Sequence, residues 1–139
     1  MDGVTVRETD GIEITTASGL RVVADGRRPD GDINFLSHAH GDHLYNDPAP
    51  SRMVMSPMTA QLAAVRRETT PETVEPPSIE QFGAGHIPGS TAIRFTDPDS
   101  GLQVLYTGDC SLRDRLFLDG FDPVPADILI TEATYGDPR

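Results

Sequence analysis

With 139 residues, 37% of them apolar, the chain can bury one modest hydrophobic core and has no room for a second full domain. Its net charge is −11 and all 11 basic residues are Arg, which argues against a polyanion partner because phosphate binding usually needs a basic face. No apolar run approaches the roughly 20 residues that span a bilayer, and the charged N-terminus has no apolar signal region. We therefore expect a cytoplasmic protein with no membrane partner. The single Cys110 leaves no partner for an internal disulfide and fits a reducing compartment.

Two considerations weaken the argument against a polyanion. An acidic composition without Lys is typical of proteins adapted to high intracellular salt, where the Debye length shrinks to about 3 Å at 1 M. A bound metal pair would also place positive charge where a phosphate has to sit. High-GC codon usage is a competing explanation for Arg in place of Lys, and the sequence does not separate the two explanations.

The first third of the chain predicts mainly strands. Residues 11–16 and 20–24 have strand-forming composition and are joined by a short turn. Residues 25–31 predict a polar loop that includes an ordinary surface pair of arginines, and residues 32–36 predict a buried strand. A short helix is expected to begin at residue 42 and run to residue 46, where prolines follow.

The middle of the chain predicts the main helix. Residues 52–55 favour another strand, and residues 58–68 favour an amphipathic helix that places Leu62 and Val65 on one apolar face. Residues 69–77 are rich in Pro and Glu and predict a surface connection.

The last part returns to strands. Residues 79–82 lead into a Gly-rich turn, residues 91–95 and 102–106 alternate as a hairpin, and residues 127–130 predict a short buried strand. Strands, a helix and then strands again indicate a layered α/β fold with a mixed sheet.

A dense cluster of metal-binding side chains follows the strand expected at residues 32–36. In an extended backbone, side chains two residues apart point the same way, so His38 and His40 can converge on one ion. Gly41 lets the chain bend, which can aim Asp42 and His43 at a neighbouring point. Neutral imidazole combined with carboxylate suits zinc best, with manganese and iron(II) as alternatives.

Two further pieces complete a pattern along the chain. His86 lies in a Gly-rich turn, and Asp109 ends the segment Thr-Gly-Asp after a strand-like run. In this order, the pieces resemble the metallo-β-lactamase fold superfamily, whose first motif reads His-x-His-x-Asp-His. The resemblance implies an α/β fold of the αββα sandwich type, here its N-terminal half with a mixed β-sheet. The alternative is a surface histidine cluster that binds no metal.

The end of the chain narrows the resemblance. Glu132 opens the segment Glu-Ala-Thr-Tyr-Gly after a strand, and this segment resembles the acidic motif of the β-CASP branch. That branch processes nucleic acids and includes the mRNA 3′-end cleavage nuclease, its archaeal relatives, RNase J-type enzymes and DNA-repair exonucleases. The alternative for Glu132 is an acid that only accepts a hydrogen bond from a nearby backbone turn.

The resemblance implies a site with two zinc ions. The ligands would be His38, His40 and His86 for one ion, Asp42 and His43 for the other, and Asp109 as the bridge between them. Glu132 would accept a hydrogen bond from a ligand imidazole and orient it. Two ions roughly 3.5–4 Å apart would lower the pKa of water to about 7 and offset charge on the phosphodiester. Asp42 or Asp109 would steer the proton, so Asp42, Asp109 and Glu132 are the expected catalytic residues.

The function implied by the resemblance is zinc-dependent cleavage of RNA, similar to mRNA 3′-end processing. The expected partner is single-stranded nucleic acid, with RNA favoured over DNA, and the full-length form is expected to be able to dimerise. The alternatives are a DNA exonuclease of the same branch, a hydrolase of small thioesters or lactones, and a non-catalytic scaffold. Residues 1–139 would be the N-terminal portion of the metallo-β-lactamase domain, without the β-CASP insertion and the later His motifs. We therefore expect the chain alone to be an incomplete enzyme.

Overall fold

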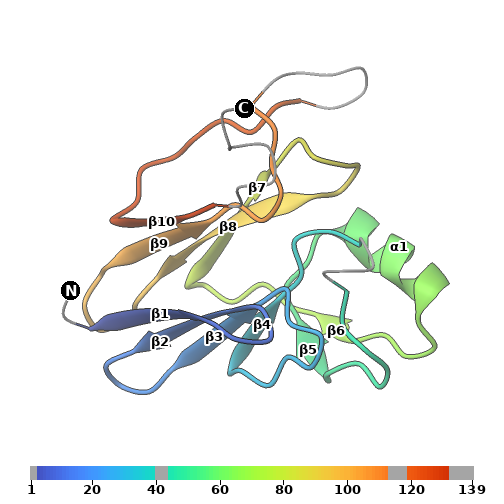
Figure 1. The fold of residues 1–139 in the computed structure, drawn as a ribbon, viewed down its shortest axis with the longest axis horizontal. Coiled ribbons are helices and arrows are strands. Elements are labelled where there is room, and N and C mark those ends of the chain that lie inside the picture. Colours follow the sequence, from blue (N-terminus) through green and yellow to red (C-terminus); the bar gives the residue numbers. More distant parts are fainter. Residues whose placement is uncertain (1–2, 40–43, 113–118, 132–139) are drawn as a thin grey trace.

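The computed structural model describes residues 3–39, 44–112 and 119–131, and these residues form ten strands and one helix (Figure 1). The elements are β1 (Val4–Glu8), β2 (Ile12–Thr16), β3 (Arg21–Ala24), β4 (Ile33–Phe35), β5 (Arg52–Met53), α1 (Pro57–Arg66), β6 (Glu72–Thr73), β7 (Ile79–Gly83), β8 (Thr91–Thr96), β9 (Gln103–Tyr106) and β10 (Ile128–Ile130). The protein is thus mixed α/β with strands dominating, in agreement with the predicted class.

The strands form two four-stranded mixed sheets and one small sheet. The first sheet has the order β1-β2-β3-β4, in which only the β3–β4 pair is parallel. The second has the order β10-β9-β8-β7, in which only the β9–β10 pair is parallel. The strands β5 and β6 pair in parallel beside the first sheet, which they reach through a bridge between Phe35 and Val54.

The main hydrophobic core joins the two larger sheets. Its buried members come from both of them and include Val4, Ile14, Val22, Ala24 and Phe35 from the first sheet and Ile93, Phe95, Val104 and Tyr106 from the second. The rings of Phe35 and Tyr106 meet edge to face, with centroids 6.2 Å apart. Burial of each large side chain contributes about 1.5–3 kcal/mol, so this shared cluster holds the two sheets in one body.

The helix α1 begins and ends close to its predicted limits, but the prediction for its apolar face was wrong. Leu62 and Val65 are 39% and 85% exposed, and the buried helical residues are Thr59 and Ala63. The cause lies at the helix start, where Thr59 bonds to the turn that carries His86. The small side chain of Ala63 then lies one turn along, against a second buried cluster that includes Leu44 and Met53.

Three other predictions need correction. The strand β1 was not predicted, because only Val4 of its five residues is buried and it is held by its register with β2. The strand β6 lies inside the predicted surface connection. The strand β10 is less buried than predicted, because it is an edge strand whose Leu129 is 62% exposed.

The short helix expected at residues 42–46 lies partly outside the described residues, and Leu44 to Asn46 are not helical. Within the residues that the structure describes, no helix is long and apolar enough to cross a membrane.

Candidate metal centre

The structure brings together three of the predicted metal ligands from three separate loops. His38 follows β4, His86 lies in the turn between β7 and β8, and Asp109 follows β9. One side chain therefore comes from the first sheet and two come from the second. Because the shared core fixes the two sheets against each other, it also fixes the distance between these three side chains.

The donor atoms are spaced as a metal ion requires. Asp109 Oδ2 lies 3.5 Å from His38 Nε2 and 3.6 Å from His86 Nε2, and all three ligand atoms lie within 4.8 Å of one another. Zinc bonds of about 2.0–2.2 Å in a tetrahedral arrangement place ligand atoms about 3.3–3.6 Å apart. The imidazole rings of His38 and His86 are nearly perpendicular, at 79°, with centroids 4.9 Å apart. Two imidazoles and a carboxylate at this spacing fit a zinc-type ion.

The hydrogen bond to the other ring nitrogen of His38 defines the form of this imidazole. Ser37 Oγ donates its only proton to Asp25 Oδ2 at 2.8 Å, so it must accept from His38 Nδ1, which also lies 2.8 Å away. The proton of the neutral ring is therefore on Nδ1, which leaves the lone pair of Nε2 directed toward Asp109 and His86. That is the tautomer that a metal-binding imidazole needs.

Asp25 is a functional residue that sequence reasoning missed. It was predicted to begin a polar loop, but it is only 7% exposed and its carboxylate accepts hydrogen bonds from Ser37 and Tyr106. Ser37 donates to it from the backbone N at 2.8 Å and from Oγ, and Tyr106 donates from its hydroxyl at 2.5 Å. Asp25 also has a φ of +56°, a left-handed conformation that Asp tolerates better than most residues. This carboxylate ties the start of the His motif to both sheets.

A sequence signal for Asp25 was available. The strands β3 and β4 are parallel neighbours with Ala24 opposite Phe35, so the residues that follow them emerge at the same edge of the sheet. Polar residues at the carboxyl ends of adjacent parallel strands commonly build sites. Asp25 and Ser37 both stand just beyond such an end, but recognising this required the parallel pairing, which the sequence pattern did not show.

Ser90 holds the turn that carries His86. Its Oγ accepts from the backbone N of His86 at 3.1 Å and of Ile87 at 3.3 Å, and its own N donates to Ile87 O. Gly85 has a φ of +75°, and a side chain there would lie 2.8 Å from the carbonyl of Ser111. The turn therefore packs backbone to backbone against the segment that follows Asp109, which places the two ligands side by side.

The helix α1 supports the same turn from the other side. Ser56 caps the helix by accepting from Thr59 N at 3.1 Å. The hydroxyls of Ser56 and Thr59 both donate to the carbonyl of Gly89, at 2.6 and 3.0 Å. The first turn of the helix is thus bonded to the loop that positions His86.

Gly108 brings Asp109 into place through a close backbone approach. Its φ is +57°, and a Cβ at this position would lie 2.7 Å from both Cβ and Oγ of Ser37. Only glycine lets the segment after β9 approach so near to the start of the His motif. The predicted Thr-Gly-Asp segment therefore needs its middle residue for reasons of space as well as conformation.

The other predicted site residues, His40, Asp42, His43 and Glu132, lie outside the described residues. The chain on both sides of residues 40–43 is well anchored. Leu44 and Tyr45 are fully buried, burial raises the pKa of the Tyr45 hydroxyl, and Arg67 Nε donates to the carbonyl of Tyr45 at 2.6 Å.

Asp47 fastens the segment after the His motif to the end of α1. The backbone N and the hydroxyl of Thr69 donate to Asp47 Oδ1, at 3.0 and 2.8 Å. These hydrogen bonds hold the pKa of Asp47 below its ordinary value. The residues before and after the central part of the motif therefore have fixed positions.

The fold and the site define a mixed α/β protein with a His-His-Asp cluster suited to a divalent metal ion. No family model matches the chain. Over 64 residues, or 43% of this chain, it is 45% identical to the probable RNase MJ4 of Methanocaldococcus jannaschii. Over 57 residues, or 40% of this chain, it is 44% identical to subunit 3 of the cleavage and polyadenylation specificity factor of Dictyostelium discoideum. Over 114 residues, or 76% of this chain, it is 31% identical to a probable DNA ligase of Opitutus terrae.

The RNase and the cleavage-factor subunit are β-CASP nucleases of the metallo-β-lactamase superfamily. The resemblance predicted from the motifs is therefore confirmed, over short parts of the chain. The chain spans only 15% of the length of the RNase, 7% of that of the cleavage-factor subunit and 11% of that of the DNA ligase.

Proposed function

We propose that the chain is the metal-binding part of a zinc-dependent β-CASP-type nuclease that hydrolyses RNA phosphodiester bonds. The observation that carries the proposal is the convergence of His38 Nε2, His86 Nε2 and Asp109 Oδ2 within 4.8 Å, on loops from both sheets. The names of two relatives, a probable RNase and a cleavage-factor subunit, support RNA as the substrate.

In this proposal, His38, His40 and His86 would hold one zinc ion, Asp42 and His43 would hold a second, and Asp109 would contribute to both. When bound, zinc makes water acidic enough to attack at neutral pH and offsets negative charge on the phosphodiester. Asp42 or Asp109 would steer the proton of the attacking water. Asp25 and Ser37 would keep the proton of His38 on Nδ1, so that the lone pair of Nε2 can coordinate an ion.

The proposal extends to the architecture. The two larger sheets would be the β layers of an αββα sandwich, with α1 in one outer layer. Residues 1–139 would be the N-terminal portion of this domain. Glu132 would orient a ligand imidazole, and single-stranded RNA would be the partner. Cleavage similar to mRNA 3′-end processing is the expected role.

A DNA-directed exonuclease of the same branch is the second candidate. One observation supports DNA as the substrate, though not exonuclease activity. The match to the probable DNA ligase covers 76% of this chain, more than either RNA-processing match covers. The proposal of an RNA substrate therefore has to be tested against DNA of the same sequence.

Cleavage of labelled single-stranded RNA and DNA of one sequence by the full-length protein tests these proposals, because we expect the present chain alone to be an incomplete enzyme. We expect RNA fragments when zinc is added, loss of cleavage with a chelator, and loss in the His86→Ala variant. Cleavage of DNA alone would transfer the proposal to the exonuclease. Turnover of a thioester or lactone with neither nucleic acid cleaved would replace it with the small-molecule hydrolase. A folded, zinc-loaded full-length protein that is inert in all of these assays would favour the scaffold.

A further inference from the structure

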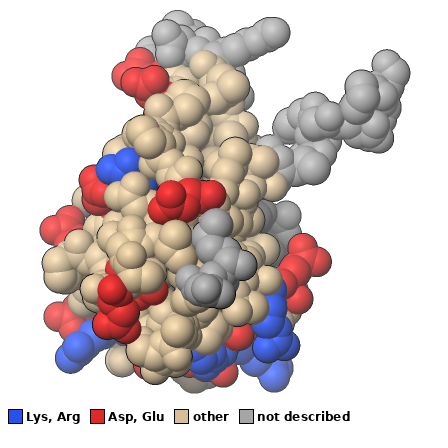
Figure 2. Space-filling model, turned by 90° about the vertical axis from the view of Figure 1, so that its left-hand side faces the viewer, with Lys and Arg blue, Asp and Glu red and all other residues tan. Residues whose placement is uncertain are grey.

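A groove on the first sheet collects much of the positive charge of this acidic chain. We call it the arginine groove, because four arginines line it around a volume of about 760 Å³. Its lining residues are Arg7, Arg21, Arg27 and Arg28 together with Thr9, Asp10, Glu13, Asp30 and Asn46. Four of the 11 basic residues thus line one groove of a chain with net charge −11. On the face that Figure 2 presents, basic side chains lie beside acidic ones in several places.

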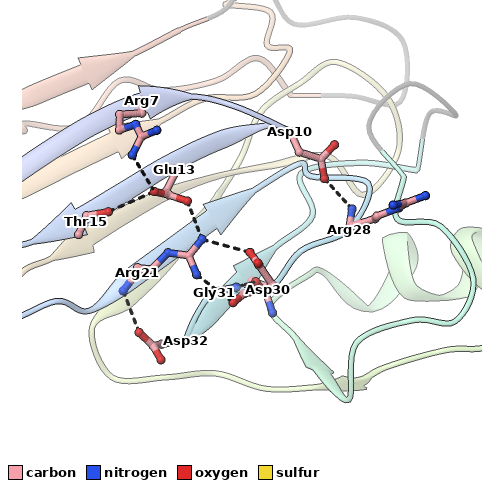
Figure 3. A network of polar contacts seen from close by, with 10 residues as sticks. Arg7, Asp10, Glu13, Thr15, Arg21, Arg28, Asp30, Gly31 and Asp32 are labelled. Atoms are coloured by element: carbon pink, nitrogen blue, oxygen red, sulfur yellow. Dashed lines mark hydrogen bonds and ion pairs between the residues drawn. The ribbon is translucent and has the colours of Figure 1, made fainter.

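Two of these arginines are neutralised within the groove. Arg21 pairs with Glu13 at 2.6 Å and with Asp30 at 3.1 Å, and Arg7 lies 4.0 Å from Glu13 (Figure 3). The hydrogen bond from Arg21 holds the pKa of Glu13 below its ordinary value. Glu13 and Asp30 therefore pair with Arg7 and Arg21, and neither lies within ion-pair distance of Arg27 or Arg28.

Arg27 and Arg28 differ from the other two arginines. Both are exposed, and among the described residues no carboxylate lies within ion-pair distance of either guanidinium. The carboxylate of Asp10 bonds to the backbone N of Arg28 at 2.7 Å, while the guanidinium points away from it (Figure 3). The positive charge of this pair is therefore available to a ligand.

The backbone that carries the pair is held in place. Asp10 fixes the N of Arg28, and the N of Asn46 donates to the carbonyl of Arg27 at 2.7 Å. At Gly11, a side chain would come within 2.5 Å of the carbonyl of Ala24, so the β1–β2 turn packs directly on this loop. Less ordering is required of such a loop when an anion binds.

The groove adjoins a second cavity that is lined by Asp25, the residue linked through Ser37 to the first predicted ligand. Arg27 also lines this second cavity of about 440 Å³, together with Asp25 and Tyr106. Asp25 is linked to His38 through Ser37, by two hydrogen bonds of 2.8 Å each. A strand that contacted Arg27 would therefore run beside the group that positions the first metal ligand.

We propose that the arginine groove binds the phosphates of a single-stranded nucleic acid outside the metal centre, with Arg27 and Arg28 as the contacting pair. The inference rests on the proposed nuclease function and adds a site for the substrate backbone. Guanidinium groups bind phosphate through two parallel hydrogen bonds, and they do so without reading the bases. An open groove with two available guanidinium groups suits a continuous strand, because successive phosphates can occupy them together.

The test is the salt dependence of binding of a labelled single-stranded RNA, measured by fluorescence anisotropy in excess chelator so that no cleavage occurs. Each phosphate contact on a single strand contributes a slope of about 0.7 in log affinity against log salt. The double variant Arg27→Ala/Arg28→Ala should therefore lower the slope by about 1.4 and weaken binding at low salt roughly tenfold or more. Arg27→Lys/Arg28→Lys should keep the slope, because it keeps the charge.

The matched control is Arg52→Ala/Arg66→Ala, which removes the same charge from exposed positions outside the groove. We expect this variant to bind RNA as the unchanged chain does, and circular dichroism would verify that both double variants fold. Equal weakening in the two double variants, or no weakening in either, would overturn the proposal.

The result is separable from the proposed function. If the protein cleaves RNA but its RNA affinity does not change in the Arg27→Ala/Arg28→Ala variant, the groove is rejected as a binding site and the nuclease proposal stands. Binding that depends on the pair, in a full-length protein that cleaves nothing, would keep the groove as a nucleic-acid site and reject the nuclease.

Discussion

Two carboxylates of this protein each collect several donors, but in different surroundings. Asp25 accepts two hydrogen bonds from Ser37 and one from Tyr106 in the interior, where it is 7% exposed. Glu13 bonds to Arg21 on the face of the first sheet, where the side chains of Glu13 and Arg21 are 12% and 36% exposed (Figure 3). Water therefore reaches the guanidinium of this pair more readily than it reaches Asp25.

The comparison shows that burial determines how much a polar contact contributes to the free energy of unfolding. A buried donor that loses its acceptor costs about 1–3 kcal/mol, whereas exposed ion pairs contribute little because water and salt screen them. We therefore expect the stability of the fold and the geometry of the metal centre to depend on Asp25, Ser37 and Gly108. The ion pair between Glu13 and Arg21 should change them only slightly.

The largest effect is expected at the buried carboxylate. Asp25→Ala leaves three donors without their acceptor and places Ala at a φ of +56°, so the free energy of unfolding should fall by roughly 3–5 kcal/mol. Urea denaturation measures this loss. Asp25→Asn keeps an acceptor and tolerates the same φ, so it should lose less. A loss below about 1 kcal/mol in Asp25→Ala would remove the contrast between the two regions.

The close approach at Gly108 provides the second test. Gly108→Ala combines a left-handed φ with a Cβ only 2.7 Å from Ser37, and it should cost about 2–4 kcal/mol in unfolding free energy. The matched control is Gly101→Ala, with a φ of +76° and no atom within 4 Å, which should cost only about 1–2 kcal/mol. Equal losses in the two variants would show that backbone conformation, and not contact with Ser37, determines the choice of glycine.

The third test separates metal affinity from stability. Ser37→Ala removes the acceptor for His38 Nδ1, so the ring can rotate or change tautomer, and zinc affinity should fall about 10- to 100-fold. Competition with a coloured chelator measures the affinity. Ser18→Ala, at an exposed turn, serves as the control and should leave affinity unchanged. If the two variants bind zinc equally well, Ser37 does not position the ligand.

The smallest effect is expected at the surface. Because Arg21 holds the pKa of Glu13 below its ordinary value of 4.5, the pair contributes stability above pH 4.5 and loses it as pH falls through the lowered pKa. Arg21→Ala should therefore lower the melting temperature slightly at pH 7, and this difference from the unchanged chain should shrink in acid. A difference of the same size at both pH values would exclude the ionic contribution.

Much of the site could be predicted from local sequence. The spacing of His38 after a strand, the isolated His86 in a Gly-rich turn and Asp109 in Thr-Gly-Asp are all short-range signals, and the structure brings these three residues together. Their role as ligands stays a prediction. Asp25 was missed because its link to Ser37 spans 12 positions and depends on the parallel pairing of β3 with β4.

The fold shows the same division between local and long-range information. The hairpin of β8 and β9 follows from alternation and turn residues, and it was confirmed. The buried face of α1 was not predictable from apolar spacing, because bonds from Ser56 and Thr59 to Gly89 orient the helix. Contacts between distant segments, which no local pattern records, decided this outcome.

The central claim is that His38, His86 and Asp109 hold a metal ion, and zinc content measured by elemental analysis after equilibrium dialysis tests it most directly. We predict at least one tightly held ion per folded chain, lost in His86→Ala and in Asp109→Ala and kept in the exposed control Arg52→Ala. A folded chain that retains no zinc, or that retains it equally well without His86, would contradict the account.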